Sequence, residues 1–461
     1  MNFGLKNKRF FKFIFILSLG ALGFVCIIIT AFGSVWTEWD YKVLDRFYRL
    51  AAASGRGPSS SSEIVYLLIT DDSYRYFKKN ILDRKDLAGI NRALSALDPE
   101  AVAYDIIFAR ESSPDADLEF THSIGQLGSA FLPVGLEYSS SKKPFKWESG
   151  SAYQRFKNEY LKNPEERGAS RPYYAIRALM QADDFSTVAY NSGHISAFSD
   201  PDGVYRHAIL LLKVEERFFP ALALSLFLDY AGVSLDEIIV EWGRRIVIPA
   251  KKGNNLENDV IIPIDDRGRA FIPFTAAWET DFKKMEAHLL VKHFENIDLR
   301  GNLIEFFEGK HVFVGDVSVG ISDLGQTPLE ADVPLIAIHT ALFNGMLTNT
   351  FYSEWHLRPV LGVIVFVGVF LGSAALPKSS WFLYIGGLVG FLGIFGLTWW
   401  QMLHFRLLPV VTVGGSAIFI LFILIAGLQI AVSRDRAFIK NAFSRYISEK
   451  VVDELMAKPE L

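Results

Sequence analysis

Four long apolar runs without any Asp, Glu, Lys or Arg constrain this chain more than any other feature of its sequence. They cover residues 13–32, 360–376, 381–403 and 407–432. About 20 apolar residues span the hydrocarbon core of a bilayer. The runs therefore predict four transmembrane helices, at residues 13–33, 358–376, 381–403 and 407–432, and a hydrophobic content of 50% in 461 residues fits a chain that lies partly in lipid.

The first run is expected to be an uncleaved anchor. A basic segment, residues 1–12, precedes it. A cleaved signal peptide also begins with basic residues, but its apolar core has about 7 to 15 residues and ends in a small-residue cleavage site. Here the run is longer and ends at Gly33-Ser34-Val35-Trp36.

Basic residues beside the runs predict the orientation, because cytoplasmic loops are enriched in Lys and Arg. The tail at residues 1–12 and the linker at residues 433–461 are both basic near the membrane, and Lys378 lies between the second and third runs. Both ends and Lys378 are therefore expected in the cytoplasm, and residues 34–356 outside it, across a bacterial inner membrane. Arg406 alone lies on the opposite side.

Two other interpretations of the runs are disfavoured. A buried helical core in a large soluble enzyme fits neither the lengths of the last three runs nor their charged flanks. A transport path usually carries ionisable groups within the membrane, and the runs contain no Asp, Glu, Lys or Arg. The single cysteine, Cys26, lies in the first run, so the exported region is expected to fold without disulfides.

Residues 34–356 are expected to form an α/β domain, a mixed and largely parallel sheet with helices on its faces. Residues 63–69 (EIVYLLI) and 101–107 (AVAYDII) have the composition of buried strands, and residues 84–97 between them have helical spacing. This order predicts a parallel pair joined by a crossover helix. Further expected strands are residues 130–136, 205–214, 269–274 and 311–314, further helices are 221–230 and 336–347, and residues 215–217 form a hairpin tip.

Carboxylates follow three of the expected strands. Asp71 and Asp72 follow the first, Asp105 closes the second, and Asp316 follows the strand at 311–314, with Asp323 in the next loop. Ligands of open parallel sheets bind outside the carboxyl ends of the strands, so these groups are candidates for one crevice. The alternative is that each Asp caps a turn or helix through its side chain.

Other patterns give no catalytic or metal site. Residues 200–206 (DPDGVYR) lack the remaining ligands of a calcium loop, so a turn with Asp202 paired to Arg206 is expected. Residues 315–320 have phosphate-loop spacing but are followed by Ile321 rather than Lys, and no G-x-S-x-G motif occurs. His288 and His293 do not have zinc-helix spacing.

Six segments in order resemble the type-two CHASE domain, a cyclase- and histidine-kinase-associated extracellular sensory module, across residues 39–352. They are DRFYR from Asp45, TDDS from Thr70, AYDIIF from Ala103, GHISAFSDPDGVYRH from Gly193, FPALA from Phe219 and HVFVGDVSVGISDLGQTPL from His311, followed by His339 in a helix. The family's arginine matches Arg84, but Asn80-Ile81-Leu82-Asp83 replaces its usual Trp-Pro pair, and residues 137–180 are unmatched. With this resemblance, the ligand-binding candidates are Asp71, Asp72, Arg84, Asp105, Asp202, Arg206, Asp316 and Asp323.

The tail resembles the lead-in to class III nucleotidyl cyclase domains. Residues 437–447 are expected to form an amphipathic helix, Ser448 to cap a second one, and Pro459 to end it. The resemblance implies the receptor part of an adenylate or guanylate cyclase, working as a homodimer in the lipid bilayer with an unknown extracytoplasmic ligand and no nucleic acid. The catalytic domain is expected to be absent from this chain, so Mg²⁺ and ATP or GTP belong to that domain and the chain itself is expected to be no enzyme.

Two alternatives remain open. The first is an exported enzyme anchored by the helices, with the strand-end aspartates as metal or acid/base groups. The second is the same sensor coupled to a kinase or diguanylate cyclase.

Overall fold

The computed structural model describes residues 3–377 and 380–443, which divide into two compact units. We call Tyr48–Ser353 the α/β unit, and the residues up to Phe47 together with those from Glu354 onward the helical unit. Most of the tail that resembles a cyclase lead-in, from residue 444 on, lies outside the described residues, as does Lys378.

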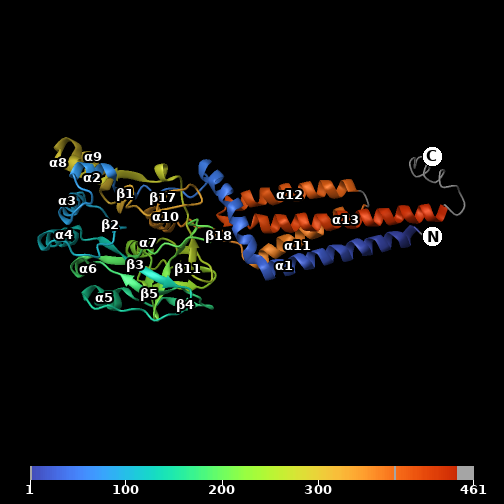
Figure 1. The fold of residues 1–461 in the computed structure, drawn as a ribbon, viewed down its shortest axis with the longest axis horizontal. Helices are drawn as coiled ribbons and strands as arrows, with labels where there is room; N and C mark the ends of the chain where they lie inside the picture. The colour runs from blue at the N-terminus through green and yellow to red at the C-terminus, as the bar shows by residue number, and fades with distance from the viewer. Residues whose placement is uncertain (1–2, 378–379, 444–461) are drawn as a thin grey trace. The chain divides into compact units, whose positions relative to one another are not determined.

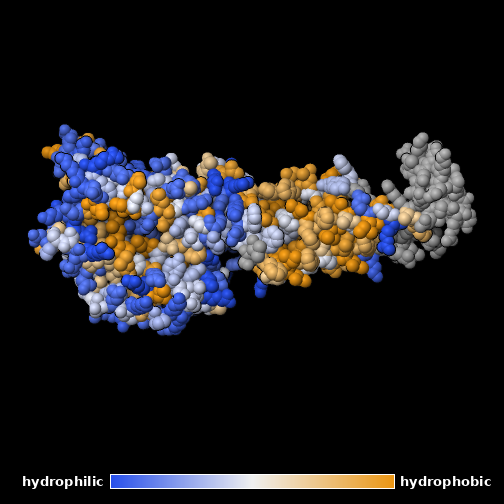
Figure 2. All heavy atoms as spheres, viewed as in Figure 1, coloured by the Kyte–Doolittle hydropathy of each residue, from blue (hydrophilic) through white to orange (hydrophobic). Residues whose placement is uncertain are grey.

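The helical unit contains four helices long and apolar enough to cross a membrane. The apolar segments are Phe10–Gly33, Leu357–Ala374, Trp381–Met402 and Val410–Arg434. They belong to helices α1 (Phe3–Ala53), α11 (Leu357–Ala374), α12 (Ser380–Met402) and α13 (Val410–Phe443). Only 22% to 33% of their most apolar windows is buried, so most of this apolar surface faces outward, as Figure 2 shows in orange over these helices. Such surface is typical of helices that lie in lipid.

Glycines allow the helices of this unit to pack closely, and tryptophans lie near the ends of its apolar segments. The helices pack where glycines admit a neighbour: a Cβ on Gly427 would meet Leu17 at 2.2 Å, and one on Gly387 would meet Leu421 at 2.6 Å. The start of α1 and the end of α13 lie at the same end of the bundle (Figure 1). Tryptophans stand where the helices leave the apolar zone, as in membrane proteins generally, at positions 36, 39, 355, 399 and 400.

Two helices need comment on their limits. The first apolar span ends at Gly33, as predicted, but the helix runs on beyond it: its backbone leaves helical geometry at Phe32 (φ −129°, ψ 20°) and then continues to Ala53. The last begins at Val410 rather than at residue 407, because Leu408 precedes Pro409 and the residue before a proline disfavours helical geometry. Arg406–Leu407 instead form the short strand β19, whose Leu407 carbonyl accepts a 3.2 Å hydrogen bond from Trp355 N.

The α/β unit is built on a sheet with the strand order β14-β1-β15-β2-β3-β5-β8-β9, in which β6 also pairs with β3. All pairings from β14 to β3, and that of β3 with β6, are parallel, whereas β3–β5 and β8–β9 are antiparallel. The sheet is therefore mixed and largely parallel, as predicted. Its strands are β1 (Ile64–Ile69), β2 (Ala101–Tyr104), β3 (Ala130–Ser139), β5 (Tyr174–Leu179), β6 (Asn191–His194), β8 (Leu211–Val214), β9 (Arg217–Pro220), β14 (Lys283–Glu286) and β15 (His311–Asp316).

The predicted pairing of the first two strands is wrong in one respect. β1 and β2 are parallel members of one sheet, but β15 lies between them and bonds to both. All three strands are buried on both faces, so nothing in their composition distinguishes which two are neighbours.

Helices cover both faces of the sheet. Val65, Leu67 and Ile69 of β1 share a core with one layer of helices, while Phe313 of β15 packs on Phe343 of the other layer at 5.8 Å between ring centroids. The first layer consists of α3 (Arg84–Ser95), α4 (Pro114–Leu127), α6 (Asp183–Val188), α8 (Ala287–Glu295) and α9 (Ile297–Phe307). The second consists of α7 (Leu222–Ala231) and α10 (Ile336–Leu347).

The predicted strand at residues 205–214 is in fact two strands in different sheets. β7 (His207–Ile209) pairs with β13 (Arg269–Phe271), and β8 joins the main sheet. The hairpin tip is confirmed, with Glu215 at φ 55° between β8 and β9. The unmatched residues 137–180 supply β5, α5 (Ser151–Arg155) and β4 (Glu165–Arg167), the last of which joins a smaller sheet with β10 (Ile239–Glu241), β11 (Arg245–Ile248) and β12 (Val260–Pro263).

Gly193 in β6 gives a test of how closely α7 packs on the sheet. A Cβ at this position would lie 2.5 Å from the Leu222 Cα atom and 2.7 Å from its nitrogen, both backbone atoms that cannot rotate away. We expect Gly193→Ala to lower the free energy of unfolding by about 1–3 kcal/mol. Chemical denaturation of the purified chain measures this change.

Gly125 provides the matched control. It lies in α4 and a Cβ there meets nothing within 4 Å, so Gly125→Ala should stabilise the chain by about 0.5–1 kcal/mol. Equal stability of the two variants would contradict the close approach of α7 to β6.

A candidate ligand site at the carboxyl edge of the sheet

Three neighbouring parallel strands end at one edge of the sheet and carry acidic residues there. Ile69, the last residue of β1, is in register with Asp316 at the end of β15. On the other side of β15, Asp105 directly follows β2 and donates its backbone N–H to the Val314 carbonyl at 2.8 Å. The carboxylates predicted at strand ends therefore share one edge, because β15 lies between β1 and β2.

Helix α2 (Asp71–Phe77) starts at this edge and holds the loop after β15 in place. Its N-cap Thr70 forms a capping box with Ser73. The Tyr74 hydroxyl donates to Asp316, whose other carboxylate oxygen accepts from the Ser318 hydroxyl at 2.6 Å. Asp71 accepts from the backbone N–H of Val319 at 3.3 Å. Asp71 and Asp316 thus fix the loop, which is the capping role weighed as the alternative to ligand binding.

The same residues border an open cleft with a volume of about 520 Å³. This volume lies within the range of small-molecule sites. Its walls combine acidic, basic, amide, hydroxyl and apolar groups. A polar ligand of moderate size would therefore contact both acidic and basic side chains. The lining residues are Asp71, Tyr74, Arg75, Lys78, Lys79, Asn80, Ser318, Val319 and Ile321.

Asp72 does not line the cleft. It pairs with Arg75 at 2.6 Å, and both side chains are more than half exposed. Exposed pairs of this kind contribute about 0–1 kcal/mol.

Asp105 belongs to a second, buried group of titratable residues. Its carboxylate lies 3.8 Å from His339 Nε2 of α10. Burial, together with the charge of Asp323, raises the pKa of Asp105 to about 7. Burial lowers the pKa of His339 to about 4, and burial together with the charge of His339 lowers the pKa of His194, at the end of β6, to about 3. An acid that titrates near neutral pH therefore lies beside the neutral imidazole of His339, and the neutral imidazole of His194 is a further neighbour of His339.

Both histidines have ring nitrogens without hydrogen-bond partners among the described residues. These are Nδ1 and Nε2 of His194 and Nδ1 of His339, in side chains that are 1% and 6% exposed. Leaving a buried polar group unpaired costs about 1–3 kcal/mol, so such groups call for an explanation beyond stability. His194 was not predicted as a site residue. Its detectable signal is an imidazole at the end of a buried strand. For His339 the signal is an imidazole in an otherwise apolar helix (IAIHTALF).

Asp202 and Arg206 lie in a separate, buried ion cluster. Arg206 is 1% exposed and forms two hydrogen bonds with Asp202, of 2.8 and 2.9 Å, and one with Asp200, of 3.2 Å. Gly203 N donates to the Asp200 carbonyl at 2.8 Å, which closes the predicted turn. The predicted pairing is confirmed, and the guanidinium occupies the place between the carboxylates that a calcium ion would need.

Arg84 does not line the cleft either. Its guanidinium lies over the rings of Phe108 at 4.7 Å and Phe185 at 5.3 Å, and its Nη2 donates to the Arg110 carbonyl at 3.1 Å. Its Nε is 3.6 Å from Asp117. This environment accounts for an arginine at the start of α3 through packing. In residues 3–377 and 380–443, no group of three or more His, Cys, Asp or Glu side chains is arranged to hold a metal ion.

The raised pKa of Asp105 makes a prediction about stability and pH. The folded chain keeps the proton up to pH of about 7, whereas an exposed Asp in the unfolded chain releases it near pH 4. Asp105 therefore lowers the free energy of unfolding as the pH rises from about 4 to about 7. The free energy of unfolding of Asp105→Asn, relative to that of the natural chain, should therefore increase by about 2–4 kcal/mol as the pH rises across this window.

Denaturation of both chains at a series of pH values measures this difference. Asp72→Asn, at an exposed position, is the control against which the pH dependence of Asp105→Asn is judged. A pH-independent difference for Asp105→Asn would contradict the assignment.

Comparison with known proteins places these observations in a family. No curated protein and no solved structure matches the chain. The CHASE2 domain matches residues 21–375, a range that extends beyond residues 39–352 into the first apolar helix and through α11. With its α/β unit and apolar helices inside or beside that match, the chain belongs to the CHASE2 family of extracellular sensor domains of signalling receptors, anchored in a membrane.

Proposed function

We propose that this chain is the sensory and transmembrane part of a receptor that passes an extracytoplasmic signal to a class III adenylate or guanylate cyclase. The observation that carries the proposal is the CHASE2 match over a chain whose α/β unit lies, in sequence, between a first apolar helix and three later ones. The chain enters and leaves the bundle at the same end, so a signal received by the sensor can reach an output joined to α13 (Figure 1).

The α/β unit lies outside the cytoplasm in this proposal, and both ends of the chain lie in the cytoplasm of a bacterium with its inner membrane around the helices. The basic residues support this orientation, because Lys8, Arg9 and Lys12 lie at the start of the first apolar helix, and Arg434 and Arg436 lie at the end of the last and just after it. Ligand binding at the carboxyl edge of the sheet is the input. A coupling free energy of about 1–3 kcal/mol between that edge and the output changes activity 5- to 150-fold.

The cyclase output rests on the resemblance at residues 443–459. Class III catalytic sites form between two catalytic domains, so the receptor is proposed to act as a homodimer. Mg²⁺ and ATP or GTP belong to the catalytic domain, which needs metal-binding aspartates to organise phosphoryl chemistry. The 461-residue chain is proposed to have no catalytic activity of its own.

The orientation is tested by labelling single cysteines in intact cells. In a Cys26→Ser background, Ser199→Cys and Lys252→Cys in exposed loops of the α/β unit are expected to react with a membrane-impermeant maleimide. Ala437→Cys, exposed on α13, is expected to react only after the cells are permeabilised. Labelling with the opposite pattern would overturn the receptor proposal.

The output is tested by the gene itself and by the purified chain. The reading frame after the Leu461 codon is expected to encode a class III catalytic domain with its metal-binding aspartates. The 461-residue chain is expected to turn over neither ATP nor GTP with Mg²⁺ or Mn²⁺, measured by chromatography of the products. A kinase or diguanylate cyclase in that reading frame, or cyclic nucleotide formed by the chain alone, would refute the cyclase assignment.

A further inference from the structure

Asp40 connects the first helix of the chain to the beginning of the last. It lies on the part of α1 beyond the irregularity at Phe32 and is 4% exposed. Its Oδ1 accepts the backbone N–H of Val411 at 2.6 Å and of Thr412 at 3.0 Å, and its Oδ2 accepts the Thr412 hydroxyl at 2.5 Å. We call these contacts the Asp40 cap.

The cap meets a need that α13 cannot satisfy locally. The first N–H groups of a helix have no partner within the helix, and a side chain at the preceding position usually accepts them. Here that position is Pro409, which has no acceptor in its side chain. A carboxylate is also favoured at this end by the helix dipole, and charge-assisted hydrogen bonds are about twice as strong as neutral ones. Asp40 therefore takes the place of a local cap from 371 positions away.

Neighbouring contacts tie the same part of α1 to the segment before α11. The Tyr41 hydroxyl donates to Glu354 at 2.5 Å, and Trp355 N donates to the Leu407 carbonyl at 3.2 Å. These residues surround a hollow of about 260 Å³ whose lining includes Asp40, Tyr41, Glu354, Trp355 and Thr412. The start of α13 is held from two sides, and the Asp40 cap acts directly on its backbone.

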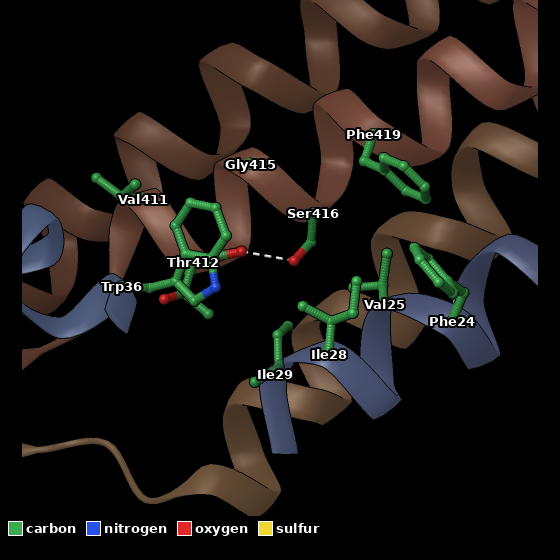
Figure 3. Close-up of a pocket in the computed structure, with 10 residues that line it drawn as sticks. All are labelled: Phe24, Val25, Ile28, Ile29, Trp36, Val411, Thr412, Gly415, Ser416 and Phe419. Carbon is green, nitrogen blue, oxygen red and sulfur yellow. Dashed lines mark hydrogen bonds between the residues drawn. The ribbon is translucent and has the colours of Figure 1, made fainter. Parts of the chain in front are cut away.

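On the N-terminal side of Asp40 along α1, a groove of about 230 Å³ separates α1 from α13 (Figure 3). The two helices meet again where Phe24 stacks on Phe419 at 5.5 Å between ring centroids. The only hydroxyls in the groove are satisfied, because Ser416 donates to the Thr412 carbonyl at 2.6 Å and Thr412 donates to Asp40. The lining residues are Phe24, Val25, Ile28, Ile29 and Trp36 of α1, and Val411, Thr412, Gly415, Ser416 and Phe419 of α13. Between the cap and the stacked rings, packing does not join the two helices closely.

We infer that Asp40 is the positioning residue through which α1 controls the placement of α13. This inference rests on the proposed receptor function and names its route. The part of α1 that carries Asp40 continues as helix from the irregularity at Phe32 to Ala53, so a displacement of its outer end moves the Asp40 carboxylate. The carboxylate holds the first N–H groups of α13, which runs without a break to Phe443. A change at the outer end of α1 is therefore passed to the end of α13 that leads to the output.

The test measures the inner ends of the two helices while the change is made at the outer end. In the full chain in lipid nanodiscs, with Cys26→Ser, spin labels are placed at exposed positions Phe11 of α1 and Ser433 of α13. Pulsed dipolar spectroscopy gives their distance distribution. Asp40→Ala is expected to displace or widen this distribution. Asp40→Asn keeps an oxygen acceptor for both N–H groups and should stay close to the natural chain.

Glu38→Ala is the matched control, since Glu38 is an exposed acid on the same stretch of α1 and is expected to leave the distances unchanged. Thr412→Val removes only the hydroxyl contact and is expected to give a smaller displacement, which provides a second measurement if Asp40→Ala does not fold. A cap with a purely structural role would lower thermal stability without altering the inner distances of the folded chain. That result for Asp40→Ala, or for Thr412→Val alone, would overturn the inference.

These distances are measured without any output domain. Unchanged distances would therefore remove the route through Asp40 and leave the receptor proposal standing. Failure of the orientation or output tests would remove the receptor proposal and leave the measured coupling of α1 to α13 in place.

Discussion

The helical unit depends on a requirement of the bilayer: apolar side chains must face hydrocarbon, while backbone polar groups must find partners where water is scarce. The outward-facing surface of the four apolar helices meets the first half. The second half is most demanding where a helix begins, and Pro409 leaves the first N–H groups of α13 without a local acceptor. Asp40 supplies that acceptor from a helix at the other end of the sequence. The need for a hydrogen-bond partner therefore joins the first helix to the last.

In the α/β unit the corresponding constraint is the shared direction of neighbouring strands. β15 lies between β1 and β2, so the residues that follow these strands meet at one edge. Asp71 and Asp316 organise the loop that borders the open cleft, and Asp105 lies beside His339. A turn-capping role and a place at a binding edge are compatible for the same carboxylate. The cap fixes the loop, and the fixed loop forms a wall of the cleft.

Two buried polar clusters in this unit differ in how far their hydrogen bonds are satisfied. The Arg206 guanidinium donates hydrogen bonds to the carboxylates of Asp200 and Asp202. Removing one of these charges would leave the opposite charge buried and unpaired. Next to Asp105, His339 has a ring nitrogen without a partner among the described residues, and so has the neighbouring His194. The first arrangement is what a structural turn requires. The second arrangement leaves polar groups unsatisfied at the edge where open parallel sheets bind ligands. Asp105 is therefore a stronger candidate for ligand binding than Asp202.

The sequence by itself determined the features that depend on a single window of residues. The lengths of the uncharged runs predicted the four apolar helices, β-branched composition predicted β1 and β15, and helical periodicity predicted α3 and α10. Ordered motifs also identified the CHASE2 family. Tertiary structure decided the features that depend on contacts between distant segments: the place of β15 in the sheet, the division of residues 205–214, the separation of Arg206 from the edge, the meeting of His339 with Asp105 and with His194, and the cap on α13. Hydropathy and propensity act within one segment, whereas strand order and buried polar contacts are set by which segments pack together, so no local pattern encodes them.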